Sequence, residues 1–293
     1  MKGIILAGGA GTRLYPSSLS ISKILLPIYD KPMIYYPLAT LMMADIKDIL
    51  VITNEADYEN FKRVLGDGKR LGMNIQYKIQ YVQRGIADAF IIAEDFINGD
   101  DVVLILGDNI FYGKNLSQVL KNAKKSNRGA TVFGYPVDDP ERFGVAEIDD
   151  SNRVISLEEK PAHPKSNYAV TGLYFYDNRV CDFAKNLTPS ARGELEITDL
   201  NKIYLAKGLL DMQILDKSYV WLDTGTHESM LEASKFVHEI EQKTGKKLAC
   251  VEEIACKEGF IDDSEILKSI EKYNNDYCNY VRKALEKQIC SRI

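Results

Sequence analysis

The chain opens with Lys2-Gly3-Ile4-Ile5-Leu6-Ala7-Gly8-Gly9-Ala10-Gly11-Thr12-Arg13, an apolar run that passes directly into clustered glycines. The run at residues 3–6 is typical of a buried strand and is too short for a secretory signal peptide. Glycines at the end of a strand let the backbone approach a ligand closely, and consecutive N–H groups there can bind an anion. The stretch therefore predicts a phosphate-binding turn after the first strand.

Two familiar phosphate motifs do not match this turn. A dinucleotide-binding fingerprint requires a third glycine where the chain has Leu14, and a P-loop requires Gly-Lys-Ser/Thr where it has Gly11-Thr12-Arg13. Arg13 and Lys23 instead supply two cations, a planar fork for bidentate phosphate contact and a mobile point charge. The alternative is a glycine turn with two solvated cations, and the turn by itself does not separate the two interpretations.

The rest of the first half alternates β-branched runs with helix-like segments, which indicates βαβ units around a parallel sheet. Strands are expected at 3–6, 49–53, 75–79 and 102–106, and helices at 32–45, 58–65 and 87–96, with Pro32 in a helix's first turn. Strands at 130–135, 145–149, 154–158 and 168–176 extend a mixed sheet, with turns at 138–140 and 149–152. The expected fold class is α/β, a doubly wound Rossmann-like mixed sheet with a helical C-terminal part.

Helices are also expected at 228–243, 264–272 and 277–288, because apolar residues recur there at helical spacing. We therefore expect a core with a mixed-sheet extension at residues 1–227. Residues 228–293 should form a helical segment packed on that core, with a role in assembly or regulation.

Composition excludes several classes of function. The chain has 293 residues, 45% of them hydrophobic, and a net charge of −5 with cations scattered among acids, so nucleic acid is not an expected partner. No apolar run approaches the ~20 residues of a membrane helix, so no membrane partner and a cytoplasmic location are expected. The five cysteines and three histidines show neither a disulfide framework nor a zinc spacing.

Carboxylates stand at the ends of two further apolar runs. Asp108 follows Leu104-Ile105-Leu106-Gly107, and Asp223 follows Tyr219-Val220-Trp221-Leu222. Two such carboxylates can hold Mg²⁺ while phosphate oxygens and waters complete its ligands, although either one alone is equally a cap or turn residue. Glu159-Lys160 pairs an acceptor for sugar hydroxyls with a cation for a sugar phosphate, and alone it is a surface ion pair.

Taken together, these motifs resemble the glucose-1-phosphate thymidylyltransferases, a family of sugar nucleotidyltransferases. The similarity extends over nearly the whole chain. The matching stretches are Lys2–Gly9, Leu25–Pro37, Leu106–Asn109, Ser156–Pro161, Tyr168–Tyr176, Arg192–Asp199 and Trp221–Thr226. The resemblance implies a fold of the nucleotide-diphospho-sugar transferase type, with a nucleotidyltransferase core and sugar-binding extension at 1–227.

The resemblance also implies a role for each site residue. Catalysis falls to Arg13, Lys23 and Lys160, and Mg²⁺ to Asp108 and Asp223. The implied nucleotide-binding set is Leu6, Gly8, Gly9, Gly11, Thr12, Arg13, Gln80, Gly85 and Asp108. The implied sugar-phosphate set is Asn109, Gly144, Glu159, Lys160, Val170 and Tyr174. At residues 81–88 the chain has Tyr-Val-Gln-Arg-Gly-Ile-Ala-Asp, where family members carry Pro-Ser-Pro-Asp-Gly-Leu-Ala-Gln beside the base.

The implied reaction joins dTTP to α-D-glucose 1-phosphate and releases pyrophosphate and dTDP-glucose, for deoxysugar and rhamnose biosynthesis. Family members are homotetramers with a regulatory nucleotide site between subunits. Two alternatives stay open: the same chemistry with UTP or another hexose 1-phosphate, and a catalytically silent regulatory homologue. A nicotinamide-dependent oxidoreductase is a remote third, already weakened by Leu14.

Overall fold

The computed structural model describes residues 1–9 and 11–292, with side chains in the last helix described up to residue 286. Its centre is a nine-stranded mixed sheet within these residues, with the strand order β10-β9-β11-β6-β1-β4-β5, and β8 and β12 joined beside β11. The parallel part contains β1 (Lys2–Leu6), β4 (Asp48–Thr53), β5 (Asn74–Ile79) and β6 (Val102–Leu106). The expected α/β mixed sheet is confirmed.

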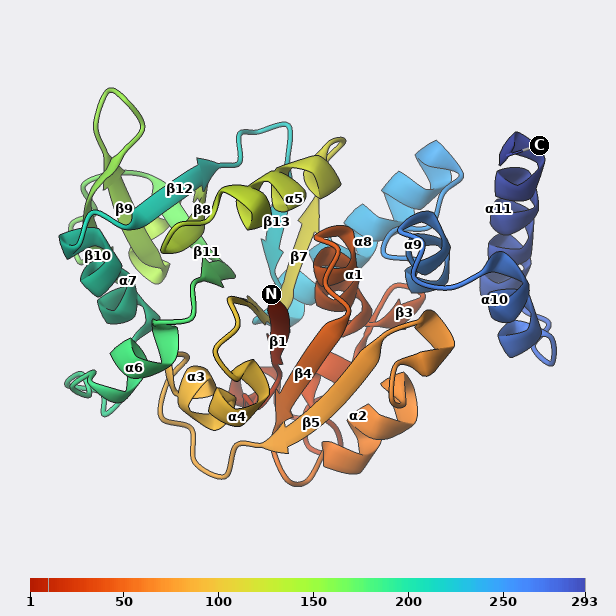
Figure 1. Cartoon of the computed structure of the whole chain (residues 1–293), viewed down its shortest axis with the longest axis horizontal. Helices are drawn as coiled ribbons and strands as arrows, with labels where there is room; N and C mark the ends of the chain where they lie inside the picture. Colours follow the sequence, from red (N-terminus) through yellow and green to blue (C-terminus); the bar gives the residue numbers. More distant parts are fainter. Residues whose placement is uncertain (10, 293) are drawn as a thin grey trace.

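The antiparallel part of the sheet begins at β11 (Tyr168–Tyr176), which pairs with β6, β8 (Ala130–Pro136) and β9 (Gly144–Ile148). The strand β10 (Val154–Glu159) completes one edge, and β12 (Leu210–Ile214) pairs parallel to β8. This extension carries Gly144, Glu159 and Tyr174 on neighbouring strands. It therefore forms a wall next to the parallel half of the sheet (Figure 1).

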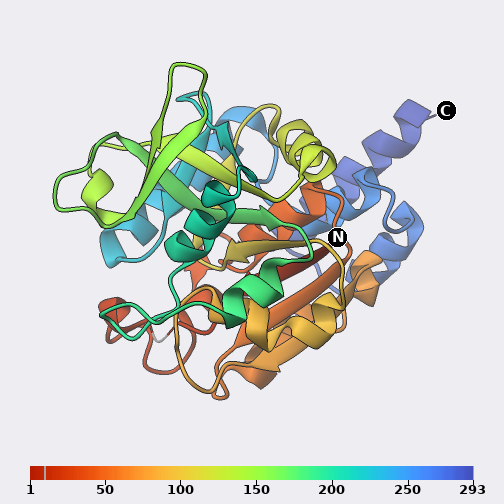
Figure 2. The ribbon, with the colours of Figure 1, turned by 60° about the vertical axis from the view of Figure 1, so that its left-hand side comes forward.

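Helices cover both faces of the sheet because alternate strand side chains point to opposite sides. Ile5 and Ile105 belong to one buried cluster, with α1 (Tyr35–Met43), α2 (Tyr58–Leu65) and α5 (Leu116–Ser126). Ile4 and Leu104 belong to the other, with α3 (Asp88–Ile92), α4 (Glu94–Ile97), α6 (Val180–Lys185) and α7 (Ile197–Ala206). The layers on the two sides are visible in Figure 2.

The expected strands agree with the structure to within one or two residues, but two helix predictions need correction. Pro32 is not in a helix: it ends the short strand β3 (Lys31–Pro32), which pairs with β2 (Pro27–Ile28), and α1 begins only at Tyr35. The helix expected at 87–96 is divided at Ala93 into α3 and α4. The turn expected at 138–140 leads into a 3-10 turn at Pro140–Arg142.

A small second sheet positions the two acidic residues singled out above. The strands β7 (Asn109–Tyr112) and β13 (Val220–Asp223) pair antiparallel, with Asp223 opposite Asn109. Asp108 directly precedes β7, and its backbone oxygen accepts hydrogen bonds from the Thr224 N–H at 3.0 Å and the Thr224 hydroxyl at 2.8 Å. Two chain segments more than 100 residues apart are thereby fixed side by side.

The C-terminal helices are α8 (His227–Thr244), α9 (Val251–Lys257), α10 (Asp263–Ile270) and α11 (Asp276–Arg292). Thr226 caps α8 in a reciprocal arrangement with Ser229. Val237 and Val251 belong to the same buried cluster as Ile5, so these helices pack on the sheet's helical layer, with α11 at the molecule's edge (Figure 1). Among the described residues, no helix has the length and apolar character needed to span a membrane.

Candidate active site

The glycine turn holds Arg13 beside the sheet. Gly11 adopts a left-handed backbone, with φ 62°, and leads into a 3-10 turn at Thr12–Leu14. Gly225, which follows β13, is where Arg13 passes: a Cβ there would lie 2.9 Å from an Arg13 guanidinium nitrogen. Arg13 is thus held between two glycine-containing segments far apart in the sequence. Ala10 lies outside the described residues.

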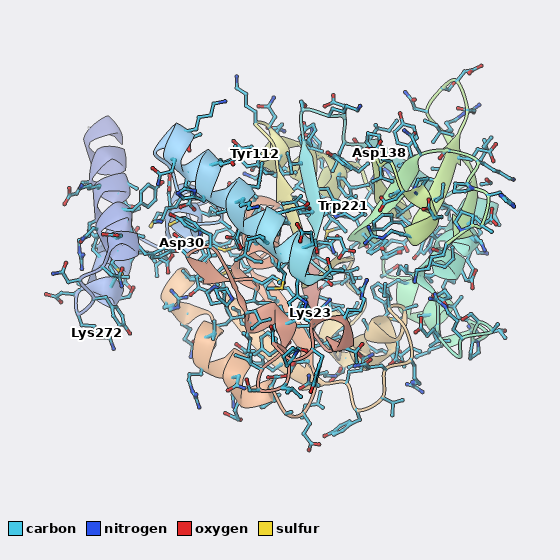
Figure 3. The ribbon with its side chains drawn as sticks, turned by 180° about the vertical axis from the view of Figure 1, so that it is seen from behind. Lys23, Asp30, Tyr112, Asp138, Trp221 and Lys272 are labelled. Carbon is cyan, nitrogen blue, oxygen red and sulfur yellow. The ribbon has the colours of Figure 1, made fainter. Side chains whose placement is uncertain are left out.

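Lys23 stands on a second 3-10 turn, Lys23–Leu25, which the Ser22 hydroxyl caps. Its ammonium pairs directly with the Asp108 carboxylate, and both side chains are largely buried, 12% and 15% exposed. The prediction that placed both groups near the carboxyl ends of β1 and β6 is consistent with this contact. Figure 3 shows Lys23 and Trp221 in the middle of the molecule, far from Lys272 at the helical edge.

Asp223 lies close enough to Asp108 for their charges to interact. Burial, and then the negative charge of Asp108, raise the pKa of Asp223 above its ordinary value, while Lys23 and Arg13 oppose that rise. Two partly buried carboxylates that repel each other favour a cation between them. Within the described residues no group of three His, Cys, Asp or Glu side chains surrounds a metal position, so phosphate oxygens or water would have to complete any such site.

The side-chain amide of Asn109 connects the acidic pair to the sheet wall. Its oxygen accepts from the Trp221 indole N–H at 2.6 Å and from the Gly172 N–H at 3.0 Å, so its nitrogen must face Asp108, to which it donates at 3.0 Å. Gly172 lies at a register shift of β11, and a Cβ there would meet the Asn109 oxygen at 2.6 Å. This network orients one Asp108 oxygen while Lys23 holds the other.

A cavity of about 430 Å³ lies between this junction and the antiparallel wall. It is large enough for a small polar ligand such as a sugar phosphate. The cavity is lined by Arg13, Ile86, Leu106, Asp108, Asn109, Arg142, Phe143, Gly144, Glu159, Lys160, Val170, Gly172, Tyr174, Ile197, Thr198, Trp221 and Asp223.

The far end of the cavity presents hydroxyl and phosphate partners. The Glu159 carboxylate accepts from the Thr198 hydroxyl at 2.5 Å and lies 3.5 Å from the Arg192 guanidinium. Lys160 holds a left-handed backbone, with φ 45°, and its side chain is half-exposed. A non-glycine residue in that conformation is strained, and such strain is concentrated at functional sites. Burial raises the pKa of Tyr174, which keeps its hydroxyl a neutral donor.

The opposite side of the glycine turn meets Gln80. A Cβ on Gly8 would lie 2.9 Å from the Gln80 side-chain oxygen, and the Gln83 amide donates to the Gly8 carbonyl at 2.8 Å. Gly85 adopts φ 99°, and a Cβ there would meet the Leu195 carbonyl oxygen at 2.5 Å. Gly85 is therefore required by the close approach of the 195 segment as well as by any ligand.

The sequence-predicted residues divide into three groups in space. Arg13, Asp108, Asn109, Gly144, Glu159, Lys160, Val170, Tyr174 and Asp223 line the cavity, and Lys23 joins them through Asp108. The second group lies along the end of β1 and its turn and contains Leu6, Gly8, Gly9, Gly11 and Thr12. The third group contains Gln80, which lies against Gly8, and Gly85, which lies against Leu195. None of the second and third groups lines the cavity itself.

Sequence reasoning missed four residues of this site. Trp221 orients Asn109, Thr198 and Arg192 hold Glu159, and Arg142 lines the cavity close enough to lower the pKa of Asp223. Thr198 and Arg192 lie inside the matching stretch Arg192–Asp199, so the signal was present without an assigned role. Arg142 follows the Asp138-Asp139-Pro140 turn and carried no signal of its own.

This arrangement suits the joining of two phosphates. At one end of the cavity, the cations Arg13, Lys23 and Arg142 lie near the two carboxylates of Asp108 and Asp223. The other end offers partners for hydroxyl groups. Such a site can neutralise two anions brought together and stabilise charge that develops between them.

The nucleotidyl transferase family model matches residues 2–240. A glucose-1-phosphate thymidylyltransferase of Neisseria meningitidis is 56% identical over 290 residues, which cover 98% of this chain and 100% of that protein. A glucose-1-phosphate thymidylyltransferase of Xanthomonas campestris is 52% identical, over 96% and 95% of the two chains. A Bacillus anthracis structure assigned as a glucose-1-phosphate thymidylyltransferase, in complex with sucrose, gives a TM-score of 0.74 at 46% identity, covering 80% of this chain and 94% of that one.

The fold and the site define a nucleotidyltransferase. With full-length similarity of this degree, the chain belongs to the glucose-1-phosphate thymidylyltransferases of the nucleotidyl transferase family. The resemblance inferred from the sequence motifs is thereby confirmed.

Proposed function

We propose that the protein transfers the thymidylyl group of dTTP to α-D-glucose 1-phosphate, forming dTDP-glucose and pyrophosphate. The observation that carries this proposal is the junction of Arg13, Lys23, Asp108 and Asp223 at one end of a polar cavity. The relatives named above act, by their names, on glucose 1-phosphate with a thymidylyl group. The site geometry supports the joining of two phosphates, and the names of these relatives favour this substrate pair over UTP or another hexose phosphate.

In this reaction an oxygen of the sugar phosphate attacks the α-phosphorus of dTTP, and the bond from that phosphorus to the β-phosphate oxygen breaks. The attacking phosphate is already ionised, so the protein need not supply a strong base. Lys160 holds the sugar phosphate, Lys23 neutralises charge on the α-phosphate, and Arg13 orients the departing pyrophosphate. The cations thus lower the repulsion between two anions and stabilise the pentacoordinate transition state.

The residues present fit Mg²⁺ as a cofactor. Asp108 and Asp223 offer two adjacent carboxylates, and Mg²⁺ in proteins commonly takes one or two carboxylates together with phosphate oxygens and water. Bound there, the ion would neutralise phosphate charge and orient the triphosphate. Asn109, through its hydrogen bond, would hold Asp108 in place for this role.

The two ends of the site would take the base and the sugar. We assign the base to Gly8, Gln80 and Gly85, with the triphosphate along Leu6, Gly9, Gly11 and Thr12. The hexose would lie against Asn109, Gly144, Glu159, Val170 and Tyr174, where Glu159 accepts hydroxyl protons and Tyr174 donates. The Asn109 oxygen is already used by Trp221 and Gly172, so only its N–H remains for a sugar.

A matrix of nucleotides against sugar phosphates, scored by pyrophosphate release, tests this function. The expected result is the highest kcat/KM for dTTP with glucose 1-phosphate. We expect measurable turnover with dUTP, because the 5-methyl group is its only difference from dTTP and contributes only about 1–3 kcal/mol. Preference for another pair would establish the first alternative, and turnover indistinguishable from buffer would establish the silent homologue.

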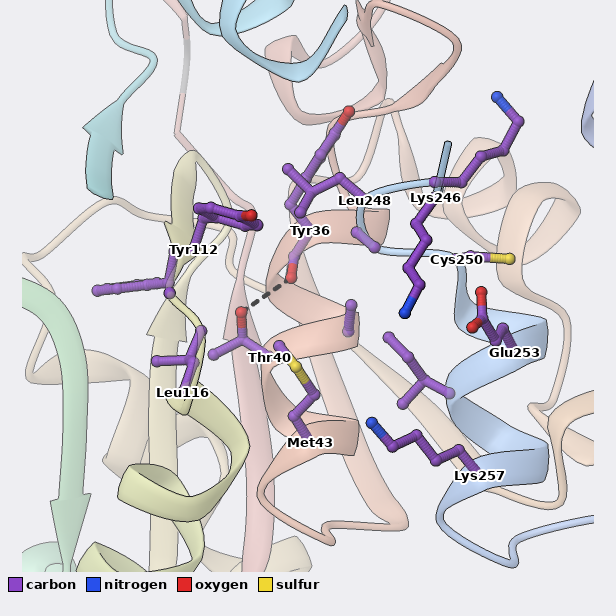
Figure 4. Close-up of a pocket in the computed structure, with 16 residues that line it drawn as sticks. Tyr36, Thr40, Met43, Tyr112, Leu116, Lys246, Leu248, Cys250, Glu253 and Lys257 are labelled. Atoms are coloured by element: carbon purple, nitrogen blue, oxygen red, sulfur yellow. Dashed lines mark hydrogen bonds between the residues drawn. The ribbon is translucent and has the colours of Figure 1, made fainter. Parts of the chain in front are cut away.

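We also infer a homotetramer with a second, regulatory nucleotide site. A second cavity, of about 200 Å³, lies between α1, the end of β7 and the α8–α9 connection (Figure 4). Tyr112 and Leu248 give it apolar walls, while Lys246 and Lys257 add cations that suit phosphates. Sedimentation velocity would check the tetramer, and binding of dTDP-glucose to an Asp108→Asn variant would check for a second site.

A further inference from the structure

The loop that departs from the family's pattern ends in a buried carboxylate. Asp88, the first residue of α3, is 1% exposed. One of its oxygens accepts from the Gln80 side-chain amide at 3.2 Å, and the other accepts from the Arg84 guanidinium at 2.8 Å. Asp88 therefore connects Gln80 to a cation on the loop.

This contact fixes which way the Gln80 amide faces. A carboxylate only accepts hydrogen bonds, so the Gln80 nitrogen must point to Asp88. The Gln80 oxygen then points to the glycine turn, 2.9 Å from where a Gly8 Cβ would stand. None of the described residues donates a hydrogen bond to that oxygen, although Gln80 is 7% exposed. A reversed amide would put two acceptor oxygens against each other.

The direction of an amide decides which pyrimidine it can pair with. Thymine and uracil present an N3–H donor beside a carbonyl oxygen, whereas cytosine presents an N3 acceptor beside an amino donor. An amide whose oxygen faces the base accepts the N3–H, and its second N–H can donate to the carbonyl. The reversed amide suits cytosine instead.

We propose that Asp88 is a positioning residue that locks the Gln80 amide in the direction that selects thymine and uracil nucleotides over cytosine nucleotides. Arg84 assists by pairing with the second Asp88 oxygen. This inference rests on the proposed function, because it takes the base to lie between Gly8 and Gln80. It assigns to Asp88 a specificity role that requires no contact with the substrate.

The test compares kcat/KM for dTTP and dCTP in the wild type and in Asp88→Asn. An asparagine can accept or donate, so it no longer dictates the Gln80 direction. The dTTP:dCTP ratio should fall about 10- to 100-fold, the range that one hydrogen bond to a charged group supports. The matched control is Asp95→Asn on α4, which breaks an ion pair with Lys78 of β5 at the surface and should leave the ratio unchanged.

A second variant, Arg84→Gln, keeps the proposal testable if the Asp88→Asn protein does not fold. Arg84 is 56% exposed, so its loss should be tolerated, and the ratio should fall in the same direction by a smaller factor. An unchanged ratio in a folded Asp88→Asn protein, or equal losses for both nucleotides, would overturn the proposal. If Asp88→Asn does not fold, an unchanged ratio in Arg84→Gln would do so.

Failure of the proposed function has a different signature. A wild type without pyrophosphate release from any nucleotide would contradict that function. Calorimetric binding of dTTP and dCTP to the same variants would then decide the role of Asp88 on its own, with the same expected change in ratio.

Discussion

Asp108 is held from two sides, by the Lys23 ammonium on one oxygen and by the Asn109 amide on the other. An asparagine at this place would keep the shape of the side chain and one of the two contacts, because its single oxygen can accept from Lys23 or from Asn109 but not from both. The negative charge is set by the carboxylate alone. A residue of this kind affects charge at the site more than the stability of the fold.

We expect Asp108→Asn to lower kcat by about 100-fold or more, the scale on which preorganised electrostatic groups act. The melting temperature should change by only a few degrees, because the lost contact is partly offset by relief of the repulsion between Asp108 and Asp223. Steady-state kinetics with Mg²⁺ measure the fall in kcat, and thermal unfolding measures the change in melting temperature. Near-normal turnover would exclude Asp108 as a metal ligand.

Lys160 is the residue proposed to bind the phosphate of the sugar. Lys160→Met keeps the aliphatic stem and removes the charge, so KM for glucose 1-phosphate should rise about 10- to 100-fold, as for the loss of one charge-assisted hydrogen bond. KM for dTTP should stay within about twofold of the wild type. A rise in the KM for dTTP with an unchanged KM for the sugar phosphate would place Lys160 at the wrong end of the site.

Residue types at strand ends predicted much of the site from sequence. Arg13, Lys23, Asp108 and Asp223 were visible because cations follow a glycine turn and carboxylates follow apolar runs. Trp221 was visible as an apolar strand residue and as the start of the matching stretch Trp221–Thr226, without an assigned role. Its role depends on a hydrogen bond to Asn109, 112 residues away, which no local pattern encodes.

The segment 224–225, which follows β13, lies close to the end of the Arg13 side chain. A Cβ at Gly225 would stand 2.9 Å from the end of the Arg13 side chain, which can move aside at little cost in stability. Gly225→Ala should therefore lower kcat/KM for dTTP by about tenfold, with a melting temperature close to the wild type. Kinetics and thermal unfolding on one preparation check this. An unchanged kcat/KM for dTTP would contradict the role of Arg13 in binding the triphosphate.

The β2–β3 hairpin is tied to the end of α8 by buried charges. Asp30 pairs with Lys31 and Lys247, and both lysines also reach Glu241, each at 3.1 Å. Burial alone would raise the pKa of Asp30, but hydrogen bonds from Lys247 and Lys31 bring it below its ordinary value. The ionised form is therefore favoured in the folded protein.

Asp30→Asn should thus destabilise the protein by about 1–2 kcal/mol at pH 7. An acid whose folded pKa is lowered contributes stability above its unfolded pKa, near ~3.9, and that contribution is lost as the pH falls through the lower folded pKa. The difference between variant and wild type should shrink below about pH 4. Urea unfolding at pH 7 and pH 3 measures this difference, with Glu59→Gln at an exposed ion pair with Lys62 as a control. A difference independent of pH would contradict this explanation.

Element boundaries show why local patterns were insufficient. Pro32 suits a helix's first turn by its fixed φ, but pairing with Pro27 in the hairpin takes precedence. The segment 87–96 has helical spacing throughout, yet the helix is interrupted at Ala93, between α3, which packs on α6, and α4. Tertiary packing decides both cases, and the sequence spacing alone does not contain it.

For the whole molecule, alternation of strand side chains between two cores explains why the fold class was predictable. Ile4 and Ile5 enter opposite clusters, and each cluster needs its own layer of helices. The helices α5, α6, α7 and α9 were not anticipated. Cys250 and Cys278 are buried thiols, and Cys290 lies beyond the described side chains. The tetramer and the cytoplasmic location stay predictions.

In the proposed reaction, an oxygen of the sugar phosphate bonds to the α-phosphorus of dTTP, and an isotope experiment can follow that oxygen into the product. Glucose 1-phosphate labelled with ¹⁸O in its phosphate would be incubated with dTTP, Mg²⁺ and the wild-type protein, and the products weighed by mass spectrometry. Attack by the sugar phosphate on the α-phosphorus predicts dTDP-glucose that keeps the whole label, with unlabelled pyrophosphate. Label in the pyrophosphate, or no dTDP-glucose above the buffer control, would contradict the account.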